Sequence, residues 1–442
     1  MQKVAVVALG CSKNTVEAEY LLGILKNKGF VLSADVREAD IVIIHTCSFI
    51  RDAREESENC IKNVLLLKNK RDVKVFVSGC LPQLLKEETV KKFPLIDGYI
   101  GTGALDKLPV LISNKQQCGS LEAGGLNDSK YRVLSSRLPS AYLKIAEGCG
   151  HKCSFCIIPS LRGKYVSRSV KSLRDEAKSL AQAGVRELVL TAQDTTSYGL
   201  DIYNVFSLDK LLSEIAKIKE LKWIRLMYAY PSGITDSLLD VFNEYKNICN
   251  YIDIPIQHIS KKVLSLMKRP PNTEKIVQKI KNRLPDIVLR TSLIAGFPQE
   301  TESDVRELIG FINKGYFQYA GVFEYSDEKN APSSKLKNQV SRAIAAKRRI
   351  EIENAQYEVF KSKMKYLKNT ETEFFAESCE KKGDKYLISG RSVFQAPEVD
   401  ANTLVSSDKA LETGKFYKAV IKNHDGYNIK AALQAPRRGK GK

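Results

Sequence analysis

The stretch AYLKIAEGCGHKCSFCIIPSLRG, residues 141–163, decides how the rest of the chain is organised. Its cysteines, Cys149, Cys153 and Cys156, follow an apolar run with the spacing C-x3-C-x2-C. A structural zinc site needs four closed ligands, usually in two paired knuckles, whereas three thiolates this close together suit a cubane iron–sulfur cluster with one iron left open. The apolar run predicts a strand over Ala141–Ala146, and parallel α/β folds place their active sites at the carboxyl ends of such strands.

Two other interpretations of this stretch stay open on the sequence. The three cysteines could be incidental buried thiols, or they could form a zinc site together with His151. The spacing favours the cluster, and it resembles without gaps the signature of the radical S-adenosylmethionine (SAM) superfamily. That resemblance implies a [4Fe-4S] cluster whose open iron binds SAM and reduces it to a 5'-deoxyadenosyl radical.

The composition is that of a globular protein with several domains. The chain has 442 residues, 43% of them hydrophobic and 27% charged, which predicts about two to four domains. No signal-peptide pattern opens the chain and no apolar run approaches the roughly 20 residues that span a bilayer, so we expect a cytoplasmic protein without disulfides. The net charge of +19 indicates an anionic partner such as nucleic acid or a ribonucleoprotein.

The first 115 residues alternate apolar runs of strand length with helical patterns. The runs KVAVVALG, DIVIIHT and VKVFVSG predict strands of a parallel sheet with helices on both faces. Cys11, Cys47 and Cys80 each stand where one of these runs ends. Because parallel strands place their carboxyl ends on one edge, three separate loops would bring three thiols together. This favours a second iron–sulfur cluster, again with one iron open, over three unrelated buried cysteines.

The pairing of such a domain with a downstream C-x3-C-x2-C motif resembles the radical SAM methylthiotransferase family over nearly the whole chain. Within that family the sequence is most similar to the branch that modifies an aspartate of small-subunit ribosomal protein twelve, and it differs from the tRNA-modifying branch in several segments. The resemblance is carried by AYLKIAEGC, CSFCIIPSLRG, AQDTTSYG (Ala192–Gly199), WIRLMYAYP (Trp223–Pro231), YIDIPIQHIS (Tyr251–Ser260), FEYSDE (Phe323–Glu328) and APEVD (Ala396–Asp400). Two positions depart from the family pattern: His45 stands where relatives usually carry Asn, and Gln395 replaces the Asp that usually precedes APEVD. Both departures put substrate contacts in question rather than the chemistry.

Residues 116–138 are polar and contain glycines, which predicts a linker, and residues 139–330 repeat a strand-then-helix unit. Six strand-like runs are too few for an eight-stranded barrel, so we expect a partial, open (β/α)6 barrel, as the resemblance also implies. Polar residues at or near the strand ends are candidate SAM contacts, although each could instead cap the barrel through an ordinary hydrogen bond. These candidates are Gln193, Asp194, Gln257, His258 and Arg290, together with Gly296, which permits close approach of the backbone to a ligand.

Residues 331–369 predict a basic helical connector, in which 335–368 hold ten Lys or Arg against three Glu. Such a charge run is usually a solvated face, and a specific anionic contact is the alternative. Residues 370–435 alternate short strands with turns, which predicts a small antiparallel β-barrel that resembles a TRAM domain. Nine Lys or Arg against ten Asp or Glu over 371–435 suit a basic protein substrate better than RNA. Residues 436–442 predict a basic tail.

The resemblance implies an enzyme that adds a methylthio group to the β-carbon of an aspartate in small-subunit ribosomal protein twelve. It also implies two [4Fe-4S] clusters, SAM as methyl donor and radical source, a flavodoxin- or ferredoxin-like electron donor and a sulfur donor, with no side chain acting as acid or base. Two alternatives stay open, namely methylthiolation of a modified adenosine in tRNA and a non-catalytic iron–sulfur carrier. We interpret the remaining cysteines as bystanders: Cys60, Cys118, Cys249 and Cys379.

Overall fold

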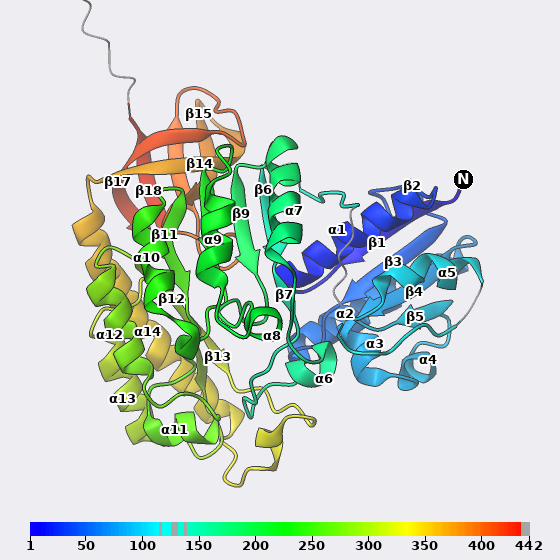
Figure 1. The fold of residues 1–442 in the computed structure, drawn as a ribbon, viewed down its shortest axis with the longest axis horizontal. Coiled ribbons are helices and arrows are strands. Elements are labelled where there is room, and N and C mark those ends of the chain that lie inside the picture. The colour runs from blue at the N-terminus through cyan, green and yellow to red at the C-terminus, as the bar shows by residue number, and fades with distance from the viewer. Residues whose placement is uncertain (115–116, 125–130, 137–138, 435–442) are drawn as a thin grey trace, which may run out of the picture.

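The computed structural model describes residues 1–114, 117–124, 131–136 and 139–434. An N-terminal parallel sheet, a larger central parallel sheet and a closed C-terminal barrel follow one another along the chain. Figure 1 shows the N-terminal sheet and the C-terminal barrel on opposite sides of the green central sheet. The expected tail and part of the expected linker lie outside the described residues.

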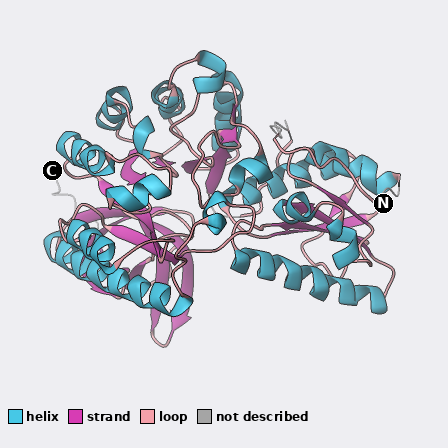
Figure 2. Ribbon diagram, turned by 90° about the horizontal axis from the view of Figure 1, so that it is seen from below, coloured by secondary structure: helices cyan, strands magenta, loops and turns pink. Residues whose placement is uncertain are grey.

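The N-terminal sheet has five parallel strands in the order β2-β1-β3-β4-β5. In the central strand β3, Val42 and Ile44 pack into one apolar cluster while Ile41 and Ile43 pack into another, because successive side chains point to opposite faces. Both faces are covered, and the strands lie between layers of helices in Figure 2. The strands are β1 (Lys3–Ala8), β2 (Val31–Leu32), β3 (Ile41–Thr46), β4 (Lys74–Gly79) and β5 (Gly98–Ile100), and the helices are α1 (Ser12–Asn27), α2 (Arg51–Leu65), α3 (Cys80–Leu85), α4 (Glu88–Lys92) and α5 (Leu108–Ser113). The predicted parallel sheet is confirmed.

The central sheet has six parallel strands in the order β13-β12-β11-β10-β9-β6. Its helix-covered face buries Leu188 and Leu190, while Val189 between them faces the opposite side with Trp223. The strands are β6 (Ser140–Lys144), β9 (Glu187–Thr191), β10 (Trp223–Leu226), β11 (Ile248–Asp253), β12 (Val288–Ala295) and β13 (Tyr319–Glu324), and the main helices are α7 (Val170–Gln182), α9 (Leu208–Ala216), α10 (Asp236–Glu244), α12 (Thr273–Arg283) and α13 (Glu302–Ile312). This is the predicted partial barrel.

Short elements flank the cysteine loop of the central sheet and the loops at its carboxyl edge. A two-stranded antiparallel ribbon pairs Ala146 with Ser167 and encloses the cysteine loop together with a five-residue helix. These elements are β7 (Ala146–Glu147), β8 (Val166–Ser167), α6 (Ile158–Arg162), α8 (Leu200–Tyr203) and α11 (Lys261–Leu266).

The C-terminal barrel closes in the order β14-β15-β16-β18-β17. The predicted small β-barrel is confirmed. Its pairs are antiparallel as expected except β16 with β18, which run parallel. The reason is topological. β17 runs antiparallel to β14, and β18 runs antiparallel to β17, so β18 has the same direction as β16, beside which it lies. The strands are β14 (Glu371–Lys382), β15 (Lys385–Ser392), β16 (Thr403–Ser407), β17 (Phe416–Asp425) and β18 (Asn428–Leu433), preceded by the long connector helix α14 (Arg342–Leu367).

Buried ion pairs join this C-terminal barrel to the central sheet. Arg391 places its guanidinium nitrogens 2.9 and 2.5 Å from the two carboxylate oxygens of Glu187. Burial alone would raise the pKa of Glu187, yet the charges of Arg391 and Arg225 outweigh it and lower that pKa to about 2. Asp400 accepts a hydrogen bond from Tyr251 at 2.7 Å. The C-terminal barrel is therefore fixed, together with α14, to the face of the central sheet that carries Val189 and Trp223.

None of the helices in the described part of the chain is both long enough and apolar enough to cross a bilayer.

Candidate functional site

The barrel cysteines are those of the central partial barrel, namely Cys149, Cys153 and Cys156. They lie in one loop between β7 and α6, where Gly148 and Gly163 fold the backbone tightly. Gly148 has a φ of +75°, and a Cβ there would lie 2.1 Å from the carbonyl oxygen of Lys164. The amide of Cys149 donates to Gly163 at 3.3 Å, and the amide of Cys156 donates to Cys153 at 3.1 Å. The local sequence alone therefore brings the three thiols to the carboxyl edge of the central sheet.

Burial raises the pKa of the Cys149 thiol to about 11 and that of Cys156 to about 12. Each thiol therefore keeps its proton unless a metal or a cation displaces it. Arg269 supplies such a cation, since its guanidinium donates to Cys153 Sγ at 3.8 Å. The same guanidinium lies 4.1 Å from the ring centre of Tyr230.

His151 is not positioned as a metal ligand. Its ring stacks on Tyr230 at 3.5 Å between centroids, and its Nε2 lies 2.7 Å from Asp194 Oδ2. Within residues 1–114, 117–124, 131–136 and 139–434, no three His, Cys, Asp or Glu side chains gather closely enough to hold a single metal ion. A zinc site would need His151 as a further ligand, but the His151 ring is already engaged by Tyr230 and Asp194.

The N-terminal cysteines come from three different strand ends. Cys11 follows β1 and caps α1, Cys47 follows β3, and Cys80 opens α3 directly after β4. These strands are neighbours in the sheet, so their ends share one edge. Gly10, with a φ of +95°, passes so close to Cys47 that a Cβ would lie 2.4 Å from the Cys47 Cβ. The structure thus brings the three cysteines to one edge of the sheet as expected, and their role as ligands stays a prediction.

A cation from the central domain reaches this N-terminal triad. Arg162, the last residue of α6, donates from Nη2 to Cys80 Sγ at 3.2 Å and to Asn14 at 2.6 Å. Burial raises the pKa of Cys80 to about 12, and the charge of Arg162 opposes that shift. The helix that follows the barrel cysteines therefore supplies the guanidinium for the other triad.

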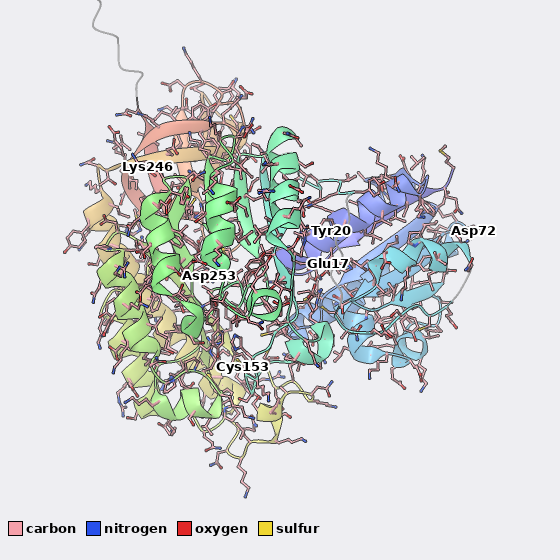
Figure 3. All side chains as sticks on the ribbon, viewed as in Figure 1. Glu17, Tyr20, Asp72, Cys153, Lys246 and Asp253 are labelled. Carbon is pink, nitrogen blue, oxygen red and sulfur yellow. The ribbon has the colours of Figure 1, made fainter. Side chains whose placement is uncertain are left out.

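Arg162 belongs to a fully buried ionic network between the two domains. Glu17 on α1 accepts from Arg162 at 2.5 Å and from Lys144 at 2.7 Å, and its second oxygen lies 3.0 Å from His45 Nε2. Lys144 also donates to Glu147 at 2.6 Å. Burial alone would raise the pKa of Glu17, but Arg162 and Lys144 hold it well below its usual value. Figure 3 shows Glu17 where α1 meets the central sheet.

Both departures from the family pattern are buried in such networks. His45 contacts Glu17 and Ser78, each at 3.0 Å. Gln395 accepts from Thr403 at 2.6 Å and donates to the backbone of Ala401 at 2.6 Å. Neither side chain is exposed, so both residues stabilise the fold and are not placed to touch a macromolecular substrate.

Two of the predicted SAM contacts lie at the end of β9. Gln193 donates to Glu147 at 2.7 Å, and its buried Oε1 has no partner among the described residues, as expected of an acceptor that awaits a ligand. Both carboxylate oxygens of Asp194 already have hydrogen-bond partners, namely Thr196, Ser197 and His151. Burial would raise the pKa of Asp194, and these hydrogen bonds lower it instead.

Gln257 and His258 follow β11. Gln257 has a φ of +70°, a strained value for a residue with a side chain, and its backbone pairs with β12 through Ser292 at 2.9 Å. Burial lowers the pKa of His258 to about 4, so its ring is neutral at physiological pH. Its Nδ1 accepts from the amide of Ser260 at 3.0 Å.

Arg290 and Gly296 have structural partners of their own. Arg290 donates to Asp253 at 2.9 Å and lies 3.4 Å from Asp400 of the C-terminal domain. At Gly296 a Cβ would lie 2.3 Å from Ala345 Cβ, so the close approach that this glycine permits is to α14. SAM binding by either residue stays a prediction.

The donor sets fit iron–sulfur clusters better than single ions. Each triad offers three thiols near a guanidinium, which balances the negative charge of a thiolate-bound cluster, and each leaves one metal position for another ligand. Cys149, Cys153 and Cys156 would hold one cluster and Cys11, Cys47 and Cys80 the other.

Comparison with known families divides the chain at the same places. Residues 3–101 match an uncharacterised family called UPF0004, residues 143–312 match the radical SAM superfamily, and residues 373–433 match the TRAM domain. Each match falls on one of the three sheets.

The chain is similar over its length to proteins named ribosomal protein uS12 methylthiotransferase RimO. It is 62% identical to the one from Endomicrobium trichonymphae, covering 98% of this chain and 99% of that protein. It is 41% identical to the one from Clostridioides difficile strain 630, covering 97% and 98%. The chain belongs to the RimO family.

Solved structures agree on the fold of this RimO-family chain. The radical SAM methyltransferase TsrM from Kitasatospora setae, with cobalamin and a [4Fe-4S] cluster bound, superposes with a TM-score of 0.57 over 75% of this chain and 77% of that one. At 16% identity the likeness concerns the fold alone.

Sequence reasoning missed the charged residues between the two triads of this RimO-family chain, chiefly Glu17, Lys144 and Arg162. A signal for these residues was present in the sequence, because the charged Lys144 and Glu147 interrupt the apolar run before Cys149. Their pairing was invisible, because Arg162 and Glu17 stand 145 residues apart.

Proposed function

We propose that the protein is a radical SAM methylthiotransferase that adds a methylthio group to the β-carbon of an aspartate in ribosomal protein uS12. The observation that carries the proposal is the arrangement of two cysteine triads on either side of one buried network, each with its own arginine. The RimO relatives, with their printed uS12 substrate, support the choice of reaction.

The barrel cysteines would hold a [4Fe-4S] cluster that, together with SAM, supplies a radical able to remove hydrogen from an unactivated carbon. No side-chain base can do this, so the protein's own residues bind, orient and balance charge. Arg269 and Arg162 stabilise thiolates, while Gln193 offers a free acceptor to SAM. The N-terminal cysteines would hold a second cluster and the sulfur to be transferred.

The predicted division into domains belongs to this proposal: 1–115 for sulfur transfer, 139–330 for the radical and 370–435 for docking of a protein substrate. The near-neutral charge of the last region supports a basic protein over RNA. A flavodoxin- or ferredoxin-like donor would supply electrons, a separate donor would supply sulfur, and a ribosomal substrate implies a cytoplasmic site of action.

Methylthiolation of tRNA is the second candidate, because the whole chain carries a net charge of +19. The experiment gives reconstituted enzyme SAM, a reductant and either uS12 or unmodified tRNA, and analyses both by mass spectrometry. A methylthio adduct on uS12 is expected. Adducts on tRNA with none on uS12 would overturn the assignment. Bound iron–sulfur clusters that do not respond to SAM, with no adduct on either substrate, would indicate an iron–sulfur carrier.

A further inference from the structure

Lys13 reaches from the N-terminal domain into the central one. It is the second residue of α1 and stands two positions after Cys11. Lys13 is only 8% exposed, and its Nζ lies 3.4 Å from the centre of the Tyr228 ring. Tyr228 stands just beyond the end of β10. The neighbouring Ser12 meets Thr191 at the end of β9 with 3.1 Å between their hydroxyl oxygens. The start of α1 therefore lies over the carboxyl edge of the central sheet.

Unlike Lys144 and Arg391, Lys13 has no acidic partner among the described residues. Lys144 is paired with Glu17 and Glu147, and Arg391 is paired with Glu187. For Lys13, no carboxylate among the described residues lies within ion-pairing distance, and its electrostatic partners are instead Tyr228 and the thiol of Cys11. Because a buried charge is costly without an opposite charge, this ammonium is suited to receive an anion.

The position of Lys13 lies between the two triads. On one side is Cys11, two residues away along the chain. On the other, Tyr230 follows Tyr228 by two residues and contacts Arg269, which donates to Cys153. Tyr228 itself has a φ of +58°, and its amide donates to Asp253 at 3.1 Å. A small group bound by Lys13 would therefore sit between the source of the radical and the site of the sulfur.

A carboxylate is the anion that this position suits. An ammonium held over a ring face keeps N–H donors free for a second partner, and a carboxylate oxygen accepts them strongly. In aspartate the β-carbon is bonded directly to the carboxylate carbon. Fixing the carboxylate would thus fix the reacting carbon within one bond.

We propose that Lys13 binds the side-chain carboxylate of the substrate aspartate and so places its β-carbon between the two triads. This proposal rests on the proposed function and names the contact by which the site recognises its substrate. It makes Lys13 a specificity residue, because asparagine has the same shape as aspartate but lacks the charge that the ammonium binds.

The experiment measures binding and turnover with a peptide that spans the target aspartate of uS12 and with its Asp→Asn counterpart. Reconstituted holoenzyme with SAM and no reductant is titrated by fluorescence anisotropy, for the unaltered chain, Lys13→Met and Lys13→Arg. We expect the unaltered enzyme to prefer the aspartate peptide by roughly 10- to 100-fold, Lys13→Met to lose that preference and Lys13→Arg to keep most of it. Lys26→Met, an exposed position on the same helix, is the matched control and should change nothing.

With reductant present, Lys13→Met should raise KM for the aspartate peptide more than it lowers kcat. An unchanged preference for aspartate in Lys13→Met would overturn the proposal, and so would loss of iron from the N-terminal triad in that variant, which would assign Lys13 to the cluster. Failure of the proposed function is separate, because it shows as no methylthio product from the unaltered enzyme with intact uS12.

Discussion

The two cysteine triads reach similar surroundings by different routes. Cys149, Cys153 and Cys156 come from one loop whose shape depends on adjacent glycines, whereas Cys11, Cys47 and Cys80 come from three strand ends that only the folded sheet brings together. The first triad therefore depends on local sequence and the second on long-range packing. The difference teaches that residue spacing predicts a group of thiols directly when one loop supplies it, whereas a group from three strand ends is predicted only through the fold of the sheet.

The triads also differ in where their cation originates. Arg269 and Cys153 belong to the same domain, but Arg162 crosses from the central domain to Cys80. The N-terminal triad thus takes its cation from the neighbouring domain. This asymmetry leads to predictions that remove one triad or its cation while leaving the other intact.

The largest effect is expected from replacing Cys149, Cys153 and Cys156 together by Ala. Reductive cleavage of SAM and methylthiolation should both become undetectable, because the open iron that binds SAM is lost. Roughly half of the iron should remain, in the separate N-terminal site. Iron analysis and chromatography of 5'-deoxyadenosine measure this, and zinc in the unaltered protein or complete loss of iron in the variant would contradict it.

Replacing Cys11, Cys47 and Cys80 together by Ala should separate the two halves of the reaction. Methylthiolation should stop while reductive SAM cleavage continues, since the barrel loop forms without the N-terminal sheet edge. Mass spectrometry of uS12 and 5'-deoxyadenosine release are compared in the same samples. If cleavage vanishes although the barrel cluster is still bound, the division of labour is wrong.

Arg162→Met tests the cation that crosses the domains. It removes Arg162, which together with Lys144 balances the charges of buried Glu17 and Glu147, and breaking a buried ion pair of this kind costs about 3–5 kcal/mol. We expect a lower urea midpoint and selective loss of iron from the N-terminal triad. Arg283→Met is the control, because its pairs with Asp236 and Asp240 are exposed and worth less than about 1 kcal/mol. Equal effects of the two variants would refute a special role for Arg162.

The smallest effect is expected from removing the charge of Glu187, which lies away from both triads and whose contribution to stability depends on pH. The pKa of Glu187 is lowered to about 2, so its pairing with Arg391 stabilises the fold above the ordinary glutamate pKa near 4.5 and loses that contribution as pH falls toward 2. Glu187→Gln should cost about 3 kcal/mol at pH 7. The difference in urea midpoint between Glu187→Gln and the unaltered chain should be smaller at pH 3 than at pH 7, and an equal difference at both pH values would contradict the assignment.

Sequence patterns predicted the strands that are long and apolar and the ends at which the cysteines stand. They missed β2 and β5, because strands of two and three residues show no periodicity. They also missed the parallel pairing of β16 with β18, which depends on how the barrel closes. Strand-end positions singled out Asp194 as a candidate SAM contact, which stays a prediction. Its partners could not be known from the sequence, because its oxygens accept hydrogen bonds from its own loop and from His151.

The contact from Arg162 to Cys80 has a consequence for the order in which the protein matures. Ribosomes make the chain from its N-terminus, so all three N-terminal thiols emerge and can fold into their sheet well before residue 162 is synthesised. During that interval Cys80 lacks the guanidinium whose charge favours its thiolate, which disfavours metal. Cluster delivery to the N-terminal triad should therefore wait until the central domain has docked, which protects an early, half-made chain from acquiring the wrong ion.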